Sequence, residues 1–212
     1  MSLIPRHQCL IYEGPPSRHL AALSVVICER LQQNYRCLYL NSRPMVVGLR
    51  SYLAATGLDV LKEIARGRLI LTSDQSHLLA GRVDVERMMQ LLRDALDEAR
   101  REGYAGLWAS GDMAWEFGPE KDYSRLLEYE WRLEEFLREN PDFGGICQYH
   151  AGTLPREYLR QGLVTHPLLF MNETMSHINP SYLSPGPSVR QAANGTKVEE
   201  VLTRFLRADD RS

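Results

Sequence analysis

Short apolar runs alternate with longer segments of helical periodicity along most of the chain. The runs predict strands at six places: Cys9–Tyr12, Cys37–Leu40, Leu69–Leu71, Leu107–Ala109, Ile146–Tyr149 and Leu168–Met171. Strands that are almost entirely apolar and alternate with helices are typical of a parallel sheet covered on both faces. The pattern therefore predicts a doubly wound, mainly parallel α/β fold.

Apolar residues recur every three or four positions between these runs, which predicts amphipathic helices. The first of these helices has Ser17 as its expected N-cap and runs to Leu31, and the second follows Pro44 and ends near Gly57. The remaining helices are predicted at residues 59–66, 84–102, 124–139 and 155–161. The segment 84–102 has the clearest apolar face of the set.

The C-terminal part of the chain has a different character. Residues 179–196 are rich in proline, glycine and serine and show no period, which predicts a linker or an extended arm after a domain at 1–178. Residues 197–212 then predict a short amphipathic helix and tail, with Val198, Val201, Leu202, Phe205 and Leu206 on one face. This helix either folds back onto the domain or docks on a partner, and we favour the first arrangement.

Composition and charge exclude several classes of protein. The 212 residues include 25 Lys and Arg against 27 Asp and Glu, a net charge of -2, which is unlike the basic surface of a nucleic-acid binder. No apolar run approaches the roughly 20 residues that span a bilayer, and the N-terminus lacks the profile of a secretion signal. The four cysteines lie far apart, so we expect a cytoplasmic protein with reduced thiols.

The turn after the first predicted strand does not form a phosphate-binding loop. Such a loop needs a second glycine, a lysine and a hydroxyl at fixed spacing after its first glycine. Counted from Gly14, those positions hold His19, Leu20 and Ala21, while prolines at 15 and 16 remove two backbone donors. ATP hydrolysis of the usual kind is not expected at this turn.

Two pairs of residues carry metal-ligating or polar side chains at strand spacing. His7 and Cys9 lie two positions apart, so both point to one face, and Cys147 and Tyr149 have the same relation. If these strands are neighbours, His7, Cys9 and Cys147 gather with His150 or His166 into a soft metal site. Because no closely spaced ligand pair supports this, we favour cysteines packed in the core and assign no metal.

Carboxylates and aromatic residues near the fourth predicted strand offer further candidates. Asp112 follows that strand, and Glu128 and Glu130 lie in the helix beyond it, where a carboxylate can act as a base, a metal anchor or a cap. Trp108, Trp115 and Tyr149 could line an apolar pocket or simply pack in the core. The order of residues shows no nucleophile with its base, so an enzyme is the interpretation we favour least.

Several segments together resemble a known family. RHQCLIYE at the start, RCLYL, the long stretch GRVDVERMMQLLRDALDEARREGYAGLWASGDMAW, and LLEYEWRLEEFL, GICQYH and VTHPLL further on are similar to the MEDS domain, from about Arg6 to Phe170. This sensory domain is named after methanogen and methylotroph proteins and the repressor DcmR. The resemblance implies a RecA/KaiC-like core without its phosphate-binding loop that senses small, hydrocarbon-type compounds.

The resemblance also implies which residues bind the ligand. The family motifs fall on His7, Cys9 and Tyr12, on Gly111 to Trp115, on Cys147 to His150, and on Thr165 to Pro167. Asp112 stands where glutamate is usual and His150 where aspartate is usual, which bears on whether the ligand is shared with relatives. The predicted ligand-binding residues are His7, Cys9, Tyr12, Glu13, Asp112, Trp115, Cys147, Tyr149, His150 and His166.

We therefore expect a non-catalytic sensory domain that binds a small molecule and regulates a separate signalling protein or transcription regulator. The sequence identifies no cofactor, and it predicts no direct contact with nucleic acid or membrane. A nucleotide-binding remnant of RecA-like ancestry, packed as a homo-oligomer, is one alternative. A structural interaction protein that works through the helix at 197–212 is another.

Overall fold

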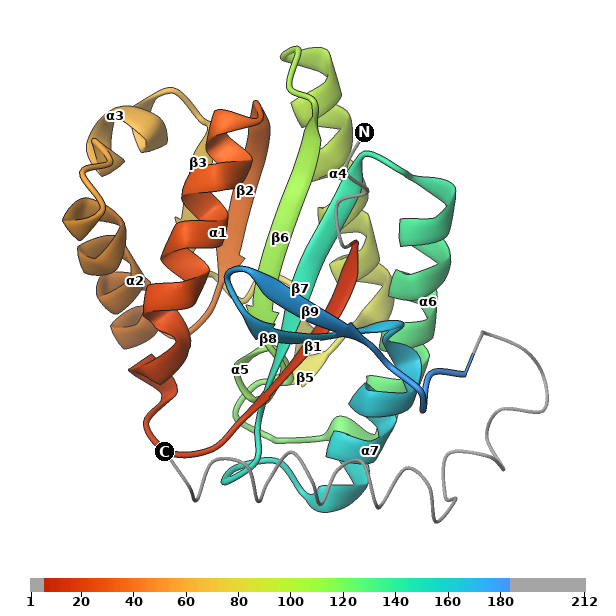
Figure 1. Cartoon of the computed structure of the whole chain (residues 1–212). Coiled ribbons are helices and arrows are strands. Elements are labelled where there is room, and N and C mark those ends of the chain that lie inside the picture. Colours follow the sequence, from red (N-terminus) through yellow and green to blue (C-terminus); the bar gives the residue numbers. More distant parts are fainter. Residues whose placement is uncertain (1–5, 184–212) are drawn as a thin grey trace.

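A seven-stranded sheet forms the centre of the molecule in the computed structural model, which describes residues 6–183 (Figure 1). Its strand order is β3-β2-β6-β7-β1-β8-β9, and every neighbouring pair is parallel except β8 and β9. The strands are β1 (His7–Tyr12), β2 (Tyr35–Leu40), β3 (Leu69–Thr72), β6 (Gly106–Asp112), β7 (Phe143–His150), β8 (Leu168–Asn172) and β9 (Met175–Ile178). A separate hairpin joins β4 (Leu78–Leu79) and β5 (Arg82–Val83).

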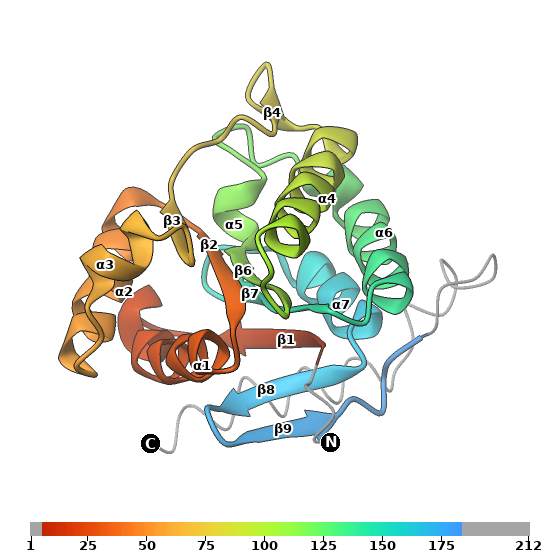
Figure 2. The same cartoon turned by 90° about the horizontal axis from the view of Figure 1, so that it is seen from above.

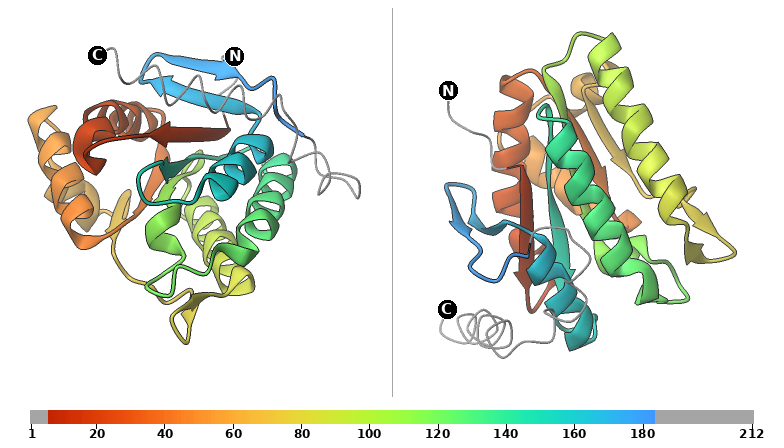
Figure 3. Two further views of the ribbon diagram at one scale, coloured as in Figure 1. Left: turned by 90° about the horizontal axis from the view of Figure 1, so that it is seen from below. Right: turned by 90° about the vertical axis from the view of Figure 1, so that its right-hand side faces the viewer.

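Helices cover both faces of this sheet, which confirms the predicted doubly wound α/β fold. They are α1 (Leu20–Gln32), α2 (Arg43–Ala55), α3 (Val60–Ala65), α4 (Val85–Arg101), α5 (Met113–Glu116), α6 (Leu126–Glu139) and α7 (Arg156–Thr165), with 3-10 turns η1 (Pro16–His19) and η2 (Tyr123–Arg125). Aspartate caps begin three of the helices, since Asp59, Asp84 and Asp112 accept a backbone N–H of the first turn. In Figure 3, α4 and α6 run side by side on one face.

The start of α1 differs from the prediction. Ser17 was expected as the N-cap, but it lies inside η1, and the α-helix begins at Leu20 without a side-chain cap. Proline fixes φ near the helical value and lacks an N–H, so Pro16 starts a tight turn before the regular helix can form.

The sequence pattern missed three short elements, namely the β4–β5 hairpin, α5 and the edge strand β9. The hairpin turn contains Ala80 at φ 51 and Gly81 at φ 79, and an alanine in the left-handed region hides the usual turn signal. Strand β9 alternates Met, Ser, His and Ile at an exposed edge, so it has no apolar run to detect.

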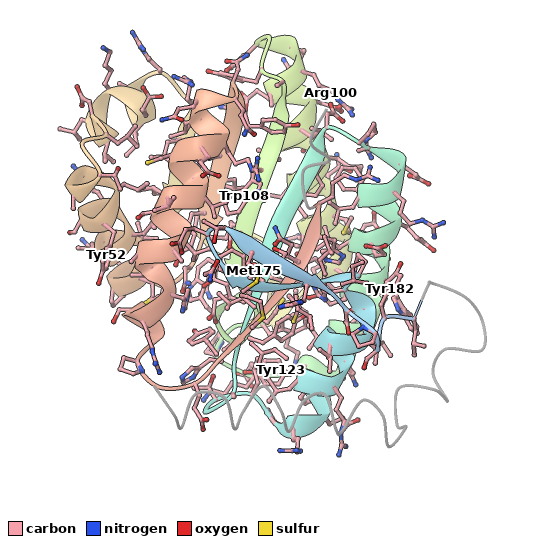
Figure 4. All side chains as sticks on the ribbon, viewed as in Figure 1. Tyr52, Arg100, Trp108, Tyr123, Met175 and Tyr182 are labelled. Atoms are coloured by element: carbon pink, nitrogen blue, oxygen red, sulfur yellow. The ribbon has the colours of Figure 1, made fainter. Side chains whose placement is uncertain are left out.

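Side chains of successive strand residues alternate between two separate cores. On β1, Cys9 and Ile11 pack under α4, α6 and α7, whereas Leu10 and Tyr12 pack under α1 and α2. Figure 2 shows these two groups of helices on opposite sides of the sheet, and Figure 4 shows Trp108 on the side of α1. Each face of the sheet can therefore carry a distinct site.

Strand β1 lies in the interior of the sheet although it comes first in the chain. It pairs with β7 from His7↔Gly145 to Tyr12↔His150, and with β8 at Gln8↔Leu168 and Cys9↔Leu169. Its two neighbours are thus formed by residues near the other end of the domain.

The predicted arm begins against the domain. The Asn179 side chain donates to the carbonyl oxygens of Leu163, at 2.5 Å, and His166, at 2.7 Å. The rest of the predicted arm, 184–196, and the predicted helix at 197–212 lie outside the described residues. Within residues 6–183, no helix is both long enough and apolar enough to cross a membrane.

Candidate functional site

The structure divides the predicted ligand-binding residues between the two faces of the sheet. Tyr12, Asp112, Trp115 and His150 line an open pocket at the carboxyl ends of the strands. The buried layer under α6 and α7 holds His7, Cys9, Cys147, Tyr149 and His166. Glu13 is exposed in the turn after β1. Tyr149 does not line the open pocket to which Trp115 contributes.

The pocket has a volume of about 270 Å³ and lies where open parallel sheets usually bind ligands. Its lining residues come from the ends of four strands and the loops beyond them: Tyr12, Asn41, Ser42, Met45, Asp112, Ala114, Trp115, Lys121, Tyr123, His150 and Thr153. This volume is slightly below the range of about 300 to 1,000 Å³ that is usual for ligand pockets, which favours a compound of few atoms.

Asp112 forms the polar floor of this pocket. Its Oδ2 accepts from the Tyr12 hydroxyl at 3.0 Å, and its Oδ1 accepts from the Trp115 backbone N–H at 3.0 Å. Burial raises the pKa of Asp112, and these two hydrogen bonds oppose that rise. The carboxylate therefore holds β1, β6 and α5 in a fixed relation around the pocket.

A chain of buried polar side chains lies beneath Tyr12. His19 Nε2 donates to Gln148 Oε1 at 2.8 Å, and Gln148 Nε2 donates to Ser110 Oγ at 2.8 Å. The Tyr12 and His19 rings lie 4.1 Å apart, centroid to centroid. His19 thus packs between the β1–α1 turn and the sheet, at the position where a phosphate-binding loop has glycine.

Acid should destabilise the protein through His19. Burial lowers the pKa of His19 to about 4. Below pH 6.5 the unfolded chain therefore takes up a proton that the folded protein does not, and the free energy of unfolding decreases as the pH decreases. We expect wild type to lose about 2 kcal/mol from this group between pH 7 and pH 5. His19→Gln keeps the donor to Gln148 and should remove that part of the loss, as measured by urea unfolding at both pH values. An equal loss in both proteins would contradict this assignment.

Under α6 and α7, four buried side chains from four separate segments of the chain lie close together. His7 Nε2 lies 3.6 Å from Glu130 Oε2, and His166 Nε2 lies 3.5 Å from the same oxygen. Cys147 Sγ lies 3.8 Å from His7 Nε2 and 3.7 Å from Glu130 Oε2. We call this group of His7, Glu130, Cys147 and His166 the buried cluster.

Local structure explains why these residues meet. Parallel pairing puts Cys9 opposite Cys147, so the face of β1 that bears His7 is also the face of β7 that bears Cys147. Glu130 and Glu134 lie four residues apart on α6 and therefore project from the same side of the helix. His166 is the residue that ends α7, immediately before Pro167.

Further buried groups orient the members of the buried cluster. His7 Nδ1 pairs with Glu134 Oε2 at 2.7 Å, and Glu134 Oε1 accepts from the Tyr182 hydroxyl at 2.6 Å. Figure 4 shows Tyr182 beside α6. The Tyr149 hydroxyl donates to Glu130 Oε1, and His166 Nδ1 donates to the Gly162 carbonyl oxygen at 2.6 Å.

The charges of these groups depend on one another. Burial opposes the ionised form of Glu130, but the hydrogen bonds from His7 and Tyr149, together with the charge of His7, hold its pKa below the usual value. Burial likewise opposes charge on His7, whereas Glu130 and Glu134 raise its pKa above the usual value. Burial, together with His7, lowers the pKa of His166 to about 4, so this ring is neutral at pH 7. The buried cluster thus combines a carboxylate, a neutral imidazole and a charged one.

The cysteines in this layer are not reactive thiols. Burial and the nearby Glu130 raise the pKa of both Cys9 and Cys147 well above the usual value. A protonated, enclosed thiol is a poor nucleophile, so covalent catalysis by these residues is not supported.

Sequence reasoning did not identify His19, Gln148, Glu116, Glu134 and Tyr182. Glu116 is buried, and burial followed by repulsion from Glu130 and Asp112 raises its pKa well above the usual value. For Glu134 a signal was present, because two glutamates stand among the apolar positions of the helix at 124–139. A charged residue on the apolar face of a helix needs a buried partner.

A cavity larger than the pocket of Tyr12 and Asp112 lies elsewhere on the sheet. It is an open groove of about 750 Å³ between α4 and the face of β2 and β3, lined by both acidic and basic side chains of α4. It contains none of the predicted ligand-binding residues, so it does not alter the choice of candidate site.

The doubly wound fold of this chain is shared with two solved structures, one of them described as a KaiC-like protein. A KaiC-like protein from the hyperthermophilic archaeon Pyrococcus horikoshii has a TM-score of 0.54 at 13% identity, covering 77% of this chain and 70% of that chain. An uncharacterized protein of the same organism, in complex with an unknown peptide, has a TM-score of 0.54 at 15% identity and covers 82% of each chain. Both show the fold alone.

Within that fold, the family is defined by sequence. The profile described as the methanogen/methylotroph, DcmR sensory domain matches residues 6–167. The chain belongs to the MEDS family, as the motifs predicted. Among curated proteins, no sequence match was found.

Proposed function

We propose that this protein is a non-catalytic sensory module that binds a small organic molecule in the pocket of Tyr12, Asp112, Trp115 and His150. The observation that carries the proposal is this pocket of about 270 Å³ at the carboxyl edge of a sensory-domain fold. Trp115, Tyr123 and Met45 supply apolar walls, and Asp112 and His150 supply polar groups. A compound with a small hydrocarbon body and one polar group fits these walls.

Regulation then passes to a separate signalling protein or transcription regulator. Asp112 joins β1 to α5 because it accepts hydrogen bonds from Tyr12 and Trp115. A ligand that displaces the Tyr12 hydroxyl therefore changes how β1 contacts α5. Such a ligand shifts the protein toward another conformation only by its difference in affinity for the two states.

A thermal-shift screen followed by one matched pair of variants tests the pocket. The screen uses small alcohols, halogenated alkanes and, separately, ATP with Mg²⁺, and a compound at a hundred times its Kd should raise Tm by roughly 5 to 10 °C. Trp115→Ala should weaken binding of the best compound at least about tenfold, because one wall of the pocket is lost. Trp131→Ala, on α6 outside the pocket, should bind as wild type does.

Two results would overturn the proposal. Equal affinity in folded Trp115→Ala and wild type would place the ligand elsewhere. Stabilisation by ATP with Mg²⁺ alone would favour the nucleotide-binding alternative, in spite of Leu20 where the lysine of a phosphate-binding loop would stand.

A further inference from the structure

We propose that His7, Glu130, Cys147 and His166 bind one divalent transition-metal ion, of which Zn²⁺ is the best fit. Two imidazole nitrogens, a carboxylate oxygen and a thiolate are donors typical of zinc centres. All four donor atoms lie within 4.8 Å of one another, and all four residues are buried. The site is separate from the pocket above and does not rest on the proposed small-molecule function.

The distances between the donors already approach those of a tetrahedral site. Bonds of 2.0 to 2.3 Å at tetrahedral angles place ligand atoms roughly 3.3 to 3.7 Å apart. Glu130 Oε2 lies 3.6 Å from His7 Nε2, 3.5 Å from His166 Nε2 and 3.7 Å from Cys147 Sγ, and the Cys147–His7 separation is 3.8 Å. The other two pairs, from His166 to His7 and to Cys147, lie within 4.8 Å, so side-chain movements of about 1 Å close the set around an ion.

Three of the four ligands are held in orientation by a partner on their other atom. Glu134 holds His7 Nδ1, the Gly162 carbonyl holds His166 Nδ1, and the Tyr149 hydroxyl holds Glu130 Oε1. Each partner leaves the remaining nitrogen or oxygen pointing into the buried cluster. Metal sites in proteins are commonly built this way, with an outer hydrogen bond fixing the tautomer and the ring.

An unpartnered acceptor independently indicates a missing cation. His166 is fully buried, and its Nε2 has no hydrogen-bond partner. Since Nδ1 donates to Gly162, Nε2 presents a lone pair, and it lies 3.5 Å from the Glu130 oxygen, which is also an acceptor. Two acceptors 3.5 Å apart in a dry interior are unfavourable unless a cation or a water lies between them.

The charge balance and the donor types select the ion. The Glu130 carboxylate and the Cys147 thiolate together match the charge of a divalent ion. Binding releases the thiol proton of Cys147 and the Nε2 proton of His7, and Glu134 stays a carboxylate that accepts the hydrogen bond of the neutral His7 ring. Nitrogen and sulfur donors disfavour Mg²⁺ and Ca²⁺, which prefer oxygen ligands. A four-coordinate set with one thiolate and two imidazoles suits Zn²⁺, and Co²⁺ can replace it as a spectroscopic probe.

Metal analysis of the full-length protein tests the proposal directly. The chain is purified after removal of any affinity tag, stripped with a chelator and titrated with Co²⁺. We expect saturation at one ion per chain, intense visible bands of a tetrahedral site and a thiolate-to-cobalt charge-transfer band, followed by displacement by Zn²⁺. Saturation well below one ion, or binding without the thiolate band, would overturn the proposal and leave a buried water as the occupant.

Matched variants assign the donors. Cys147→Ser should lose the charge-transfer band, whereas Cys37→Ser, a buried cysteine in the core on the other face of the sheet, should keep it. Glu134→Gln should keep the band and weaken affinity about 10- to 100-fold, because Glu134 orients His7 without binding the ion. Circular dichroism checks that each variant is folded, and the band persisting in folded Cys147→Ser would contradict the assignment.

Discussion

Replacing Glu130 by alanine should be among the most damaging single changes in this protein. The carboxylate is fully buried and faces His7, His166 and the Tyr149 hydroxyl. Its removal takes one of two carboxylates from the charged His7 ring and leaves the Tyr149 hydroxyl without its partner in a low-dielectric interior. Breaking a buried pair in this way costs about 3 to 5 kcal/mol, which corresponds to a fall in Tm of roughly 6 to 20 °C for a chain of this size.

The measurement compares two glutamates on one helix. Thermal and urea unfolding of Glu130→Ala are set against Glu135→Ala, an exposed residue of α6, with chelator present throughout so that metal binding does not contribute. Glu135→Ala should change stability by less than about 0.5 kcal/mol. If the two variants unfolded alike, the buried ion pairs would have no structural role.

Gly145→Ala should destabilise the protein by about 3 kcal/mol or more. A Cβ at this position would lie 2.1 Å from the Ala109 carbonyl oxygen, and both atoms belong to the backbone of neighbouring central strands. Because the sheet backbone cannot move aside as a side chain can, β6 and β7 must separate. The displacement would also move Cys147, which follows two residues later on the same face of β7.

The adjacent glycine of β7 provides the control. A Cβ on Gly144 would meet the backbone of Arg6 at 3.3 Å, beyond the N-terminal end of β1, where a shift of a few tenths of an ångström relieves the contact. We expect Gly144→Ala to cost at most about 1 kcal/mol and Gly145→Ala to unfold at clearly lower urea concentration. If Gly144→Ala were the less stable of the two variants, the close contact between the backbones of β6 and β7 would not be the reason why Gly145 cannot be replaced.

Much of the fold was predictable from the sequence because its signals are local. Apolar runs and helical periods are set by residues two to four positions apart, and they placed the six predicted strands and the long helices. The elements that were missed have weak local signals, as in β9, where the exposed edge needs no continuous apolar run. The helix start at Leu20 was misplaced because a proline turn precedes it.

The candidate site was only partly predictable, because it depends on which strands are neighbours. Alternation along β1 correctly placed His7 and Cys9 on one face. The strand that pairs with β1 is β7, whose partner residues lie 138 positions later, as in His7↔Gly145, and so leave no local pattern. On sequence grounds, Tyr149 was grouped with Trp115. Tyr149 lies two positions from Cys147 on β7, so both side chains point to the face of the sheet that is covered by α6. Residues such as Tyr182, which reaches Glu134, contribute through tertiary packing alone.

The interior position of β1 has a consequence for the synthesis of this protein. The ribosome makes β1 before the other strands of this sheet, yet both of its neighbours, β7 and β8, lie beyond residue 142. For most of translation the nascent chain carries an apolar strand with two unpaired edges, a species prone to aggregate. Completion of the sheet must wait for the closing of a long loop, which slows folding and makes the newly made chain a natural client for chaperones.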